Sequence, residues 1–105
     1  MIRVMIGNHD EMMRKKMEDV VRKQTQCRLI GTYEKGNLLL SGIQENEPDV
    51  VLLNPVLPGL DGIGVIEKIR SDVPYDGIRF ILVANSKQTK VLEILKNRKN
   101  VKFFL

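Results

Sequence analysis

The sequence of 105 residues predicts an α/β fold in which helices cover both faces of a parallel sheet. Short apolar runs alternate with helix-patterned stretches of about 10 to 15 residues, and this alternation is typical of right-handed β-α-β units. The run at residues 50–53 (VVLL) is apolar throughout, as expected of a strand with helices on both sides. We therefore predict a single domain spanning residues 1–105, with five strands separated by four helices.

The first half of the chain is expected to hold three strands and two helices. A strand over residues 2–6 ends before Gly7, and Asn8 with Glu11 three residues later has the spacing of a helix-capping box. Apolar residues then recur at helical spacing through about Gln24: Met13, Met17, Val20 and Val21. The next elements are a strand over 27–33, a helix over 37–46 with an apolar stripe, and the strand over 50–53.

The second half continues the alternation. Asp61 is expected to cap a helix that runs from Gly62 to about Ser71, with Leu60 and Val65 flanking the cap as a hydrophobic staple. The remaining elements are a buried strand over 79–84, a helix over 86–98 and a strand over 101–105.

Charge and cysteine usage restrict the function. The formal net charge is +4, but the Lys and Arg residues are spread over the first and last helices without an aromatic stacking motif, which favours solvated helix faces over a nucleic-acid surface. Cys27 is the single cysteine, so we expect a buried small side chain and not a nucleophile. No apolar run approaches the ~18 residues needed to cross a bilayer, and the N-terminus does not resemble a signal peptide. We expect a cytoplasmic protein with no membrane partner.

Three stretches carry a resemblance to a known family. They are the opening strand IRVMI with a polar pair after it, YEKGNLLLSGI at 33–43 and PDVVLLNPVLPGLDG at 48–62. Together they resemble the receiver domain of response regulators in bacterial two-component signalling, most of all the sporulation-regulator type, over all 105 residues. The resemblance implies a flavodoxin-like sheet of order 2-1-3-4-5 whose final helix is absent from this chain. It also implies the family's turn after the third strand, at Pro58, Asp61 and Gly62.

The residues that carry receiver chemistry differ from the family pattern. The resemblance places Asn8 and His9 at the metal-binding acidic pair, Asn54 at the phosphoacceptor aspartate and Val83 at the switch Ser or Thr. The family lysine would follow Leu105. Mg²⁺ prefers anionic oxygens, so its binding should be lost or weak, and an amide is a poor nucleophile, so no acyl phosphate should form. We expect no enzyme activity and no cofactor.

Several alternatives remain open at this point. Asp10 could replace a metal ligand, although a carboxylate near a helix start is more simply a dipole-stabilising residue. His9 could be a phosphohistidine or a metal ligand, although a lone His without other ligands nearby is more often a solvated loop residue. A flavin-dependent electron carrier shares this fold, but it needs a phosphate cradle after the first strand, where Asp10 and Glu11 would oppose an anion.

The expected role is protein-protein interaction without phosphate control, with an attached output domain or a separate protein as partner. As an alternative, the domain is the regulatory part of a transcription factor, which would bind DNA only through a segment beyond Leu105. Without a final helix, the fourth and fifth strands would expose an apolar strip on one face. We therefore expect either that the natural protein continues past Leu105 or that two copies associate through this face.

Overall fold

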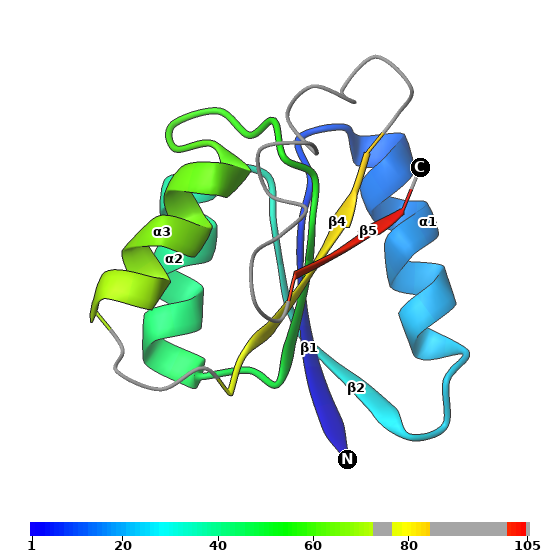
Figure 1. Cartoon of the computed structure of the whole chain (residues 1–105). Coiled ribbons are helices and arrows are strands. Elements are labelled where there is room, and N and C mark those ends of the chain that lie inside the picture. Colours follow the sequence, from blue (N-terminus) through cyan, green and yellow to red (C-terminus); the bar gives the residue numbers. More distant parts are fainter. Residues whose placement is uncertain (73–76, 85–100, 105) are drawn as a thin grey trace.

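Five parallel strands form one sheet in the computed structural model, which describes residues 1–72, 77–84 and 101–104 (Figure 1). The strand order is β2-β1-β3-β4-β5, and every neighbouring pair is parallel. The strands are β1 (Ile2–Gly7), β2 (Cys27–Tyr33), β3 (Val50–Leu53), β4 (Arg79–Val83) and β5 (Val101–Phe104). The predicted α/β fold with a parallel sheet is confirmed.

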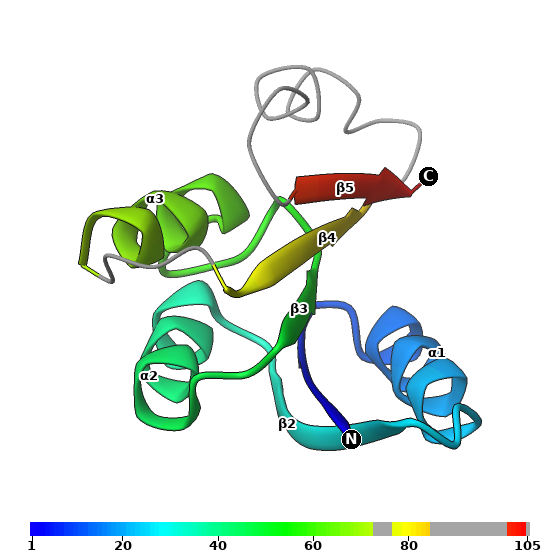
Figure 2. The ribbon, with the colours of Figure 1, turned by 60° about the horizontal axis from the view of Figure 1, so that its bottom comes forward.

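Three helices lie within the described residues, and they cover the two faces of the sheet. They are α1 (Glu11–Arg22), α2 (Gly36–Asn46) and α3 (Gly62–Asp72). Figure 2 shows α1 on one side of the sheet and α2 with α3 on the other. The helix predicted over residues 86–98 lies outside the described residues. None of the helices in the described ranges is both long and apolar enough to cross a membrane.

The central strand separates two hydrophobic clusters because its side chains alternate between the faces. Val51 and Leu53 belong to the larger cluster, which is beneath α2 and α3. Val50 and Leu52 pack against the smaller cluster, which includes Met17 of α1. Because both clusters are apolar, the strand is apolar at every position, and this is why its bounds could be predicted from sequence.

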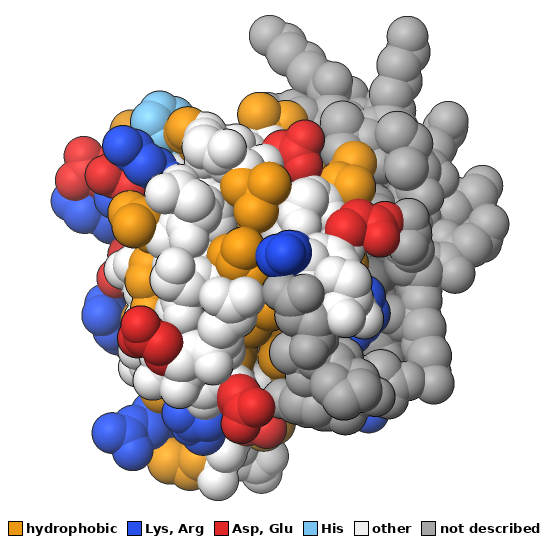
Figure 3. Space-filling view, turned by 90° about the vertical axis from the view of Figure 1, so that its left-hand side faces the viewer, with side chains coloured by type: hydrophobic (Ala, Val, Ile, Leu, Met, Phe, Trp, Pro, Cys, Tyr) orange, Lys and Arg blue, Asp and Glu red, His pale blue; other side chains and the backbone are white. Residues whose placement is uncertain are grey.

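The α1 and α2 surfaces differ in charge. Seven of the 12 residues of α1 (EMMRKKMEDVVR) are charged, whereas Glu45 is the one charged residue of α2 (GNLLLSGIQEN). Figure 3 looks onto the side covered by α2 and α3, where few charged side chains lie near the centre. Among the described helices, the strongly charged α1 is the one that lies on its face of the sheet.

The apolar pattern predicted for α1 is buried only in part. Of the four residues that recur at helical spacing, Met17 and Val21 are buried, whereas 38% of Met13 and 60% of Val20 are exposed. The helical stripe is therefore narrower than the apolar pattern suggested, since α1 meets the sheet through the Met17 and Val21 side. Val20 instead borders a groove beside the sheet.

Candidate functional site

The carboxyl ends of β1, β3 and β4 bring three of the predicted site residues together. The Asn54 backbone N–H donates to the Gly7 carbonyl oxygen at 2.9 Å, which places the residue after β3 next to the end of β1. The Asn54 side chain reaches in the other direction to Val83, the last residue of β4. Asn8, Asn54 and Val83 therefore lie at one edge of the sheet, where parallel α/β folds place their functional groups.

Both polar atoms of the Asn54 side chain are hydrogen-bonded. Its Nδ2 donates to the Val83 carbonyl oxygen at 3.2 Å. Its Oδ1 accepts from the Val56 backbone N–H at 2.8 Å, which fixes the start of the following loop. The residue is half-buried. An amide suits this position because it supplies a donor for the carbonyl of β4 and an acceptor for the loop, while an ionised carboxylate supplies only acceptors.

Asn8 is buried, with 3% of its surface exposed. Its Oδ1 accepts from the Asp10 backbone N–H at 2.9 Å, and its Nδ2 lies 3.5 Å from the Met17 Sδ. The Asn8 backbone N–H donates to the Tyr33 carbonyl oxygen at 3.0 Å, so the chain still runs alongside β2 at this point. Asn8 thus belongs to the turn between β1 and α1 and directs its amide toward α1.

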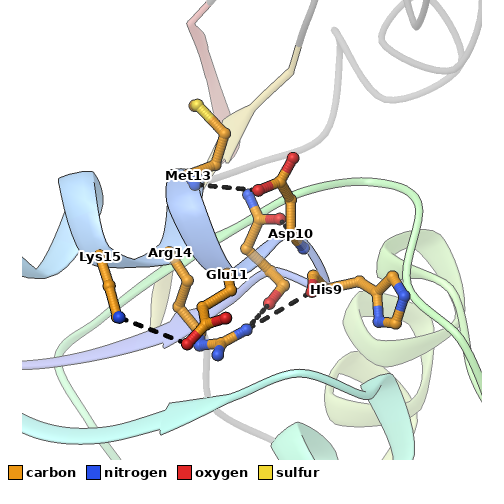
Figure 4. A network of polar contacts seen from close by, with 7 residues as sticks. His9, Asp10, Glu11, Met13, Arg14 and Lys15 are labelled. Carbon is orange, nitrogen blue, oxygen red and sulfur yellow. Dashed lines mark hydrogen bonds and ion pairs between the residues drawn. The ribbon is translucent and has the colours of Figure 1, made fainter.

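The predicted capping box at Asn8 and Glu11 is wrong, because α1 begins later. Asp10 is the N-cap residue, and its Oδ1 accepts from the Met13 backbone N–H at 3.1 Å (Figure 4). Asn8 cannot cap the helix while its own backbone continues the strand pairing. The structure thus gives Asp10 a capping role at the end of α1 where a negative charge is favoured by the helix dipole.

Arg14 stabilises the same turn, a role that the sequence pattern did not reveal. Its guanidinium Nη1 donates to the Asn8 carbonyl oxygen at 2.9 Å and lies 3.5 Å from the His9 carbonyl oxygen. The sequence pattern placed Arg14 among the solvent-facing cations of α1, and no spacing rule distinguishes it from Lys15. The His9 side chain is exposed and points away from this network (Figure 4).

The loop between β3 and α3 is held at both ends. The Gly62 backbone N–H donates to the Pro55 carbonyl oxygen at 2.8 Å, and the Asp61 Oδ1 accepts from the Gly64 backbone N–H at 2.7 Å. The second bond confirms the predicted cap at Asp61. The middle of the loop is bound to α2, since the Gly36 backbone N–H donates to the Pro58 carbonyl oxygen at 2.9 Å.

Val83 presents its backbone and not its side chain to this edge. The carbonyl oxygen accepts from Asn54, while the side chain packs with the cluster on the α1 side of the sheet. That side chain also lines an apolar groove between α1 and the sheet, with a volume of about 360 Å³. We call it the α1 groove; its lining residues are Met13, Lys16, Met17, Val20, Leu52, Ile81 and Val83.

Acidic and other ligand groups do not gather at this edge. Among the residues that the structure describes, no three His, Cys, Asp or Glu side chains lie close enough together to share a metal ion. The amide oxygens of Asn8 and Asn54 already accept hydrogen bonds from backbone N–H groups. The site is therefore a set of hydrogen-bonded amides that join β1, β3, β4 and the first turn of α1.

Comparisons with known proteins agree with this architecture. The model of the response regulator receiver domain matches residues 4–101. Protein-glutamate methylesterase/protein-glutamine glutaminase 2 of Methanosarcina acetivorans is 32% identical over 73 residues, which are 70% of this chain and 20% of that protein. Its counterpart in Nitratidesulfovibrio vulgaris is 29% identical over 93 residues, 89% of this chain and 24% of that protein. The chain thus spans about a fifth to a quarter of these relatives.

Solved structures share the fold at lower sequence identity. The response regulator domain of Thermotoga maritima CheB has a TM-score of 0.80 at 24% identity, covering 98% of this chain and 76% of that one. The receiver domain of the putative response regulator NarL from Mycobacterium tuberculosis has a TM-score of 0.82 at 21% identity, covering 97% and 82%. With the family match extending over nearly the whole chain, these findings show that the protein belongs to the response regulator receiver domain family of two-component signalling.

Proposed function

We propose that this receiver domain works as a protein-interaction module that is not controlled by phosphorylation. The observation that carries the proposal is the Asn54 side chain, an amide whose nitrogen and oxygen are both engaged, by Val83 and Val56. Asn54 takes the position of the phosphoacceptor aspartate. An amide oxygen is a weak nucleophile, and forming an acyl phosphate would require a carboxylate that the chain does not supply there.

The neighbouring residues support the same proposal. Asn8 and His9 take the positions of the acidic pair, and Val83 takes that of the switch hydroxyl. Asn8 is buried against Met17 and directs its Oδ1 to the Asp10 backbone, while the His9 ring is exposed. The Val83 side chain is aliphatic and packs in the cluster on the α1 side, so it has no group that could donate a hydrogen bond to a phosphoryl oxygen.

The residues at this edge do not fit Mg²⁺, the ion that receiver phosphorylation uses. A hard divalent cation needs several oxygens, preferably anionic, around one point. The Asn8 and Asn54 oxygens are committed to backbone N–H groups, and the Asp10 carboxylate caps α1 through Met13. Releasing any of them would leave a backbone donor without its partner, so metal binding would have to offset that loss.

The partner is a second protein surface, either an output domain joined to this chain or a separate protein. Similar structures carry different outputs: they include RcsB dimers bound to DNA and a DNA-binding response regulator of the LuxR family from Staphylococcus aureus. By that analogy the domain regulates transcription through a DNA-binding segment outside this chain. The half-buried Ile81 and Val83 of β4, beside α1, offer a face through which two copies associate.

Amide NMR spectra with Mg²⁺ and beryllofluoride, a mimic of the phosphoryl group, test the proposal. We expect the spectrum to be unchanged by the mimic, because no carboxylate at residue 54 can bind it. A receiver domain with an aspartate at this position, measured in the same buffer, serves as the positive control. Saturable shifts clustered at residues 8, 9, 54 and 83 would show that the pocket still binds and switches, and would overturn the proposal.

A further inference from the structure

Three hydrophobic side chains of α1 are exposed although most residues of this helix are charged. The exposed fractions are 69% for Met12, 38% for Met13 and 60% for Val20. Met13 and Val20 are seven residues apart, about two helical turns, so they lie on the same side of α1. Both also border the α1 groove, which makes their exposed surface continuous with an apolar depression in the molecule.

The described residues that line the α1 groove are apolar except for one cation, Lys16. Leu52, Ile81 and Val83 form its sheet side, and all three are half-buried. Met13, Met17 and Val20 form its helix side, and Lys16 is the one charged side chain among the described residues that line it. Flexible methionine side chains adapt readily to a partner, and a contiguous apolar surface of this kind marks an interaction site.

The charged residues next to Met13 and Val20 include a cation and an anion. Lys16 and Asp19 lie three residues apart on α1, on the flank next to Val20. The two salt bridges seen on α1 join Lys15 to Glu11 and Arg22 to Glu18, so neither includes Lys16 or Asp19. A surface with exposed apolar residues beside one cation and one anion can bind a second copy of itself, because each charge can face its opposite in the other copy.

We propose that α1 pairs with α1 of a second copy of this chain, antiparallel about a two-fold axis near the middle of the helix. This inference deepens the proposed interaction function and rests on it. An antiparallel pairing places Met13 opposite Val20 of the second copy and Lys16 opposite Asp19 of the second copy. Each contact occurs twice, because the two-fold axis repeats it, and the Lys23 stem covers Met12 in the same arrangement.

A second copy fits this surface better than a partner with a single sign of charge. A purely acidic partner would meet Asp19, and a purely basic one would meet Lys16. On the other side of the sheet, Leu38 of α2 is 48% exposed, but Glu45 is the one charged residue of that helix, so α2 by itself does not pair a cation with an anion (Figure 3). The surface is one helix wide, so the dimer belongs with small interfaces that dissociate readily.

Sedimentation equilibrium of the 105-residue chain, with charge-reversal variants, tests this pairing. Lys16→Glu and Asp19→Lys should each raise the dimer dissociation constant about tenfold or more, because each places like charges opposite one another. The double variant K16E/D19K should return it to within about threefold of the original, since the opposite charges are restored. Circular dichroism of each variant checks that its helices are retained.

Val20→Glu should also raise the dissociation constant at least about tenfold, whereas Leu38→Glu on α2, at another exposed aliphatic residue, is the control and should leave it unchanged. A chain that stays monomeric at high concentration, a dimer that V20E does not weaken, or a double variant no tighter than the single ones would overturn the pairing. A dimer unaffected by V20E would leave the proposed interaction function intact. Binding of beryllofluoride would overturn the proposed function and leave the pairing unaffected.

Discussion

The side-chain nitrogen of Asn54 donates a hydrogen bond to the Val83 carbonyl oxygen, 3.2 Å away and 29 residues later in the chain. The bond joins the end of β3 to the end of β4 through an amide, at the edge where the receiver fold carries its chemistry. An aspartate would keep the contact with Val56 but could not donate to Val83 unless it were protonated. The amide therefore suits a structural role at this position.

Replacing Asn54 by Asp should destabilise the protein in a pH-dependent way. Above the pKa of the introduced carboxyl, a carboxylate oxygen at residue 54 would face the Val83 carbonyl oxygen, and neither could donate a hydrogen bond. We expect a loss of about 1 to 2 kcal/mol in the free energy of unfolding. Burial beside a carbonyl oxygen raises the folded-state pKa of this carboxyl above its unfolded value. The variant should therefore regain stability as the pH falls, because the protonated group can donate to Val83.

Urea unfolding at several pH values, expressed as the difference from the unmodified protein, measures this effect. Asn54→Leu is the matched control: it removes the hydrogen bonds to Val83 and Val56 but adds no titrating group, so its deficit should not change with pH. If N54D were as stable as the unmodified protein at about pH 8, well above the ordinary carboxyl pKa, the Asn54 nitrogen would contribute nothing to the β4 contact.

Replacing Gly36 by Ala should destabilise the protein strongly. A Cβ atom at Gly36 would lie 1.5 Å from the Leu60 carbonyl oxygen, so the start of α2 and the β3–α3 loop would have to separate. The cost should be about 2 kcal/mol or more, although Gly to Ala normally favours a helix. Denaturant unfolding measures it, with the exposed Ser41→Ala on α2 as a control that should change stability by less than about 0.5 kcal/mol. An equally small change for G36A would mean that this loop does not pack on α2.

Replacing Asp10 by Ala should cost about 1 kcal/mol of unfolding free energy, because the Met13 backbone N–H would lose its capping acceptor. Asp10→Asn keeps an oxygen acceptor and should lose much less. The two variants are compared by thermal and urea unfolding. Equal losses in D10A and D10N would indicate that the negative charge of Asp10 stabilises α1 and that the hydrogen bond to Met13 does not. An Asn8→Ala variant does not test the cap, because a larger loss there would reflect only the burial of Asn8.

Strand positions could be predicted from sequence because a short run that is apolar at every position is typical of a strand buried on both faces. The bounds of β2 and β3 agree with the prediction to the residue, and Asp61 caps α3 as expected. The meeting of Asn8, Asn54 and Val83 at one edge follows from parallel topology alone. Local pattern and global fold agree at these positions.

Details that depend on tertiary contacts could not be predicted in this way. The stretch Asn8 to Glu11 contains two residues that can cap a helix, and only the bond from Asn8 to Tyr33 shows that the chain is still extended at Asn8. Val20 has the correct helical spacing for the core, but its exposure depends on how far the sheet extends beneath α1. The close approach of Gly36 to Leu60 joins the start of α2 to the β3–α3 loop, which is distant in sequence.

Phosphorylation itself is the most direct test of the central claim. The protein is incubated with acetyl phosphate and Mg²⁺, and its intact mass is measured beside that of a receiver domain with a phosphoacceptor aspartate. We expect the control to gain a phosphoryl group and this protein to remain unmodified, and N54D to show little modification because Asn8 and His9 still replace the metal-binding acids. An acid-stable, base-labile gain of one phosphoryl group in the unmodified protein would contradict the account.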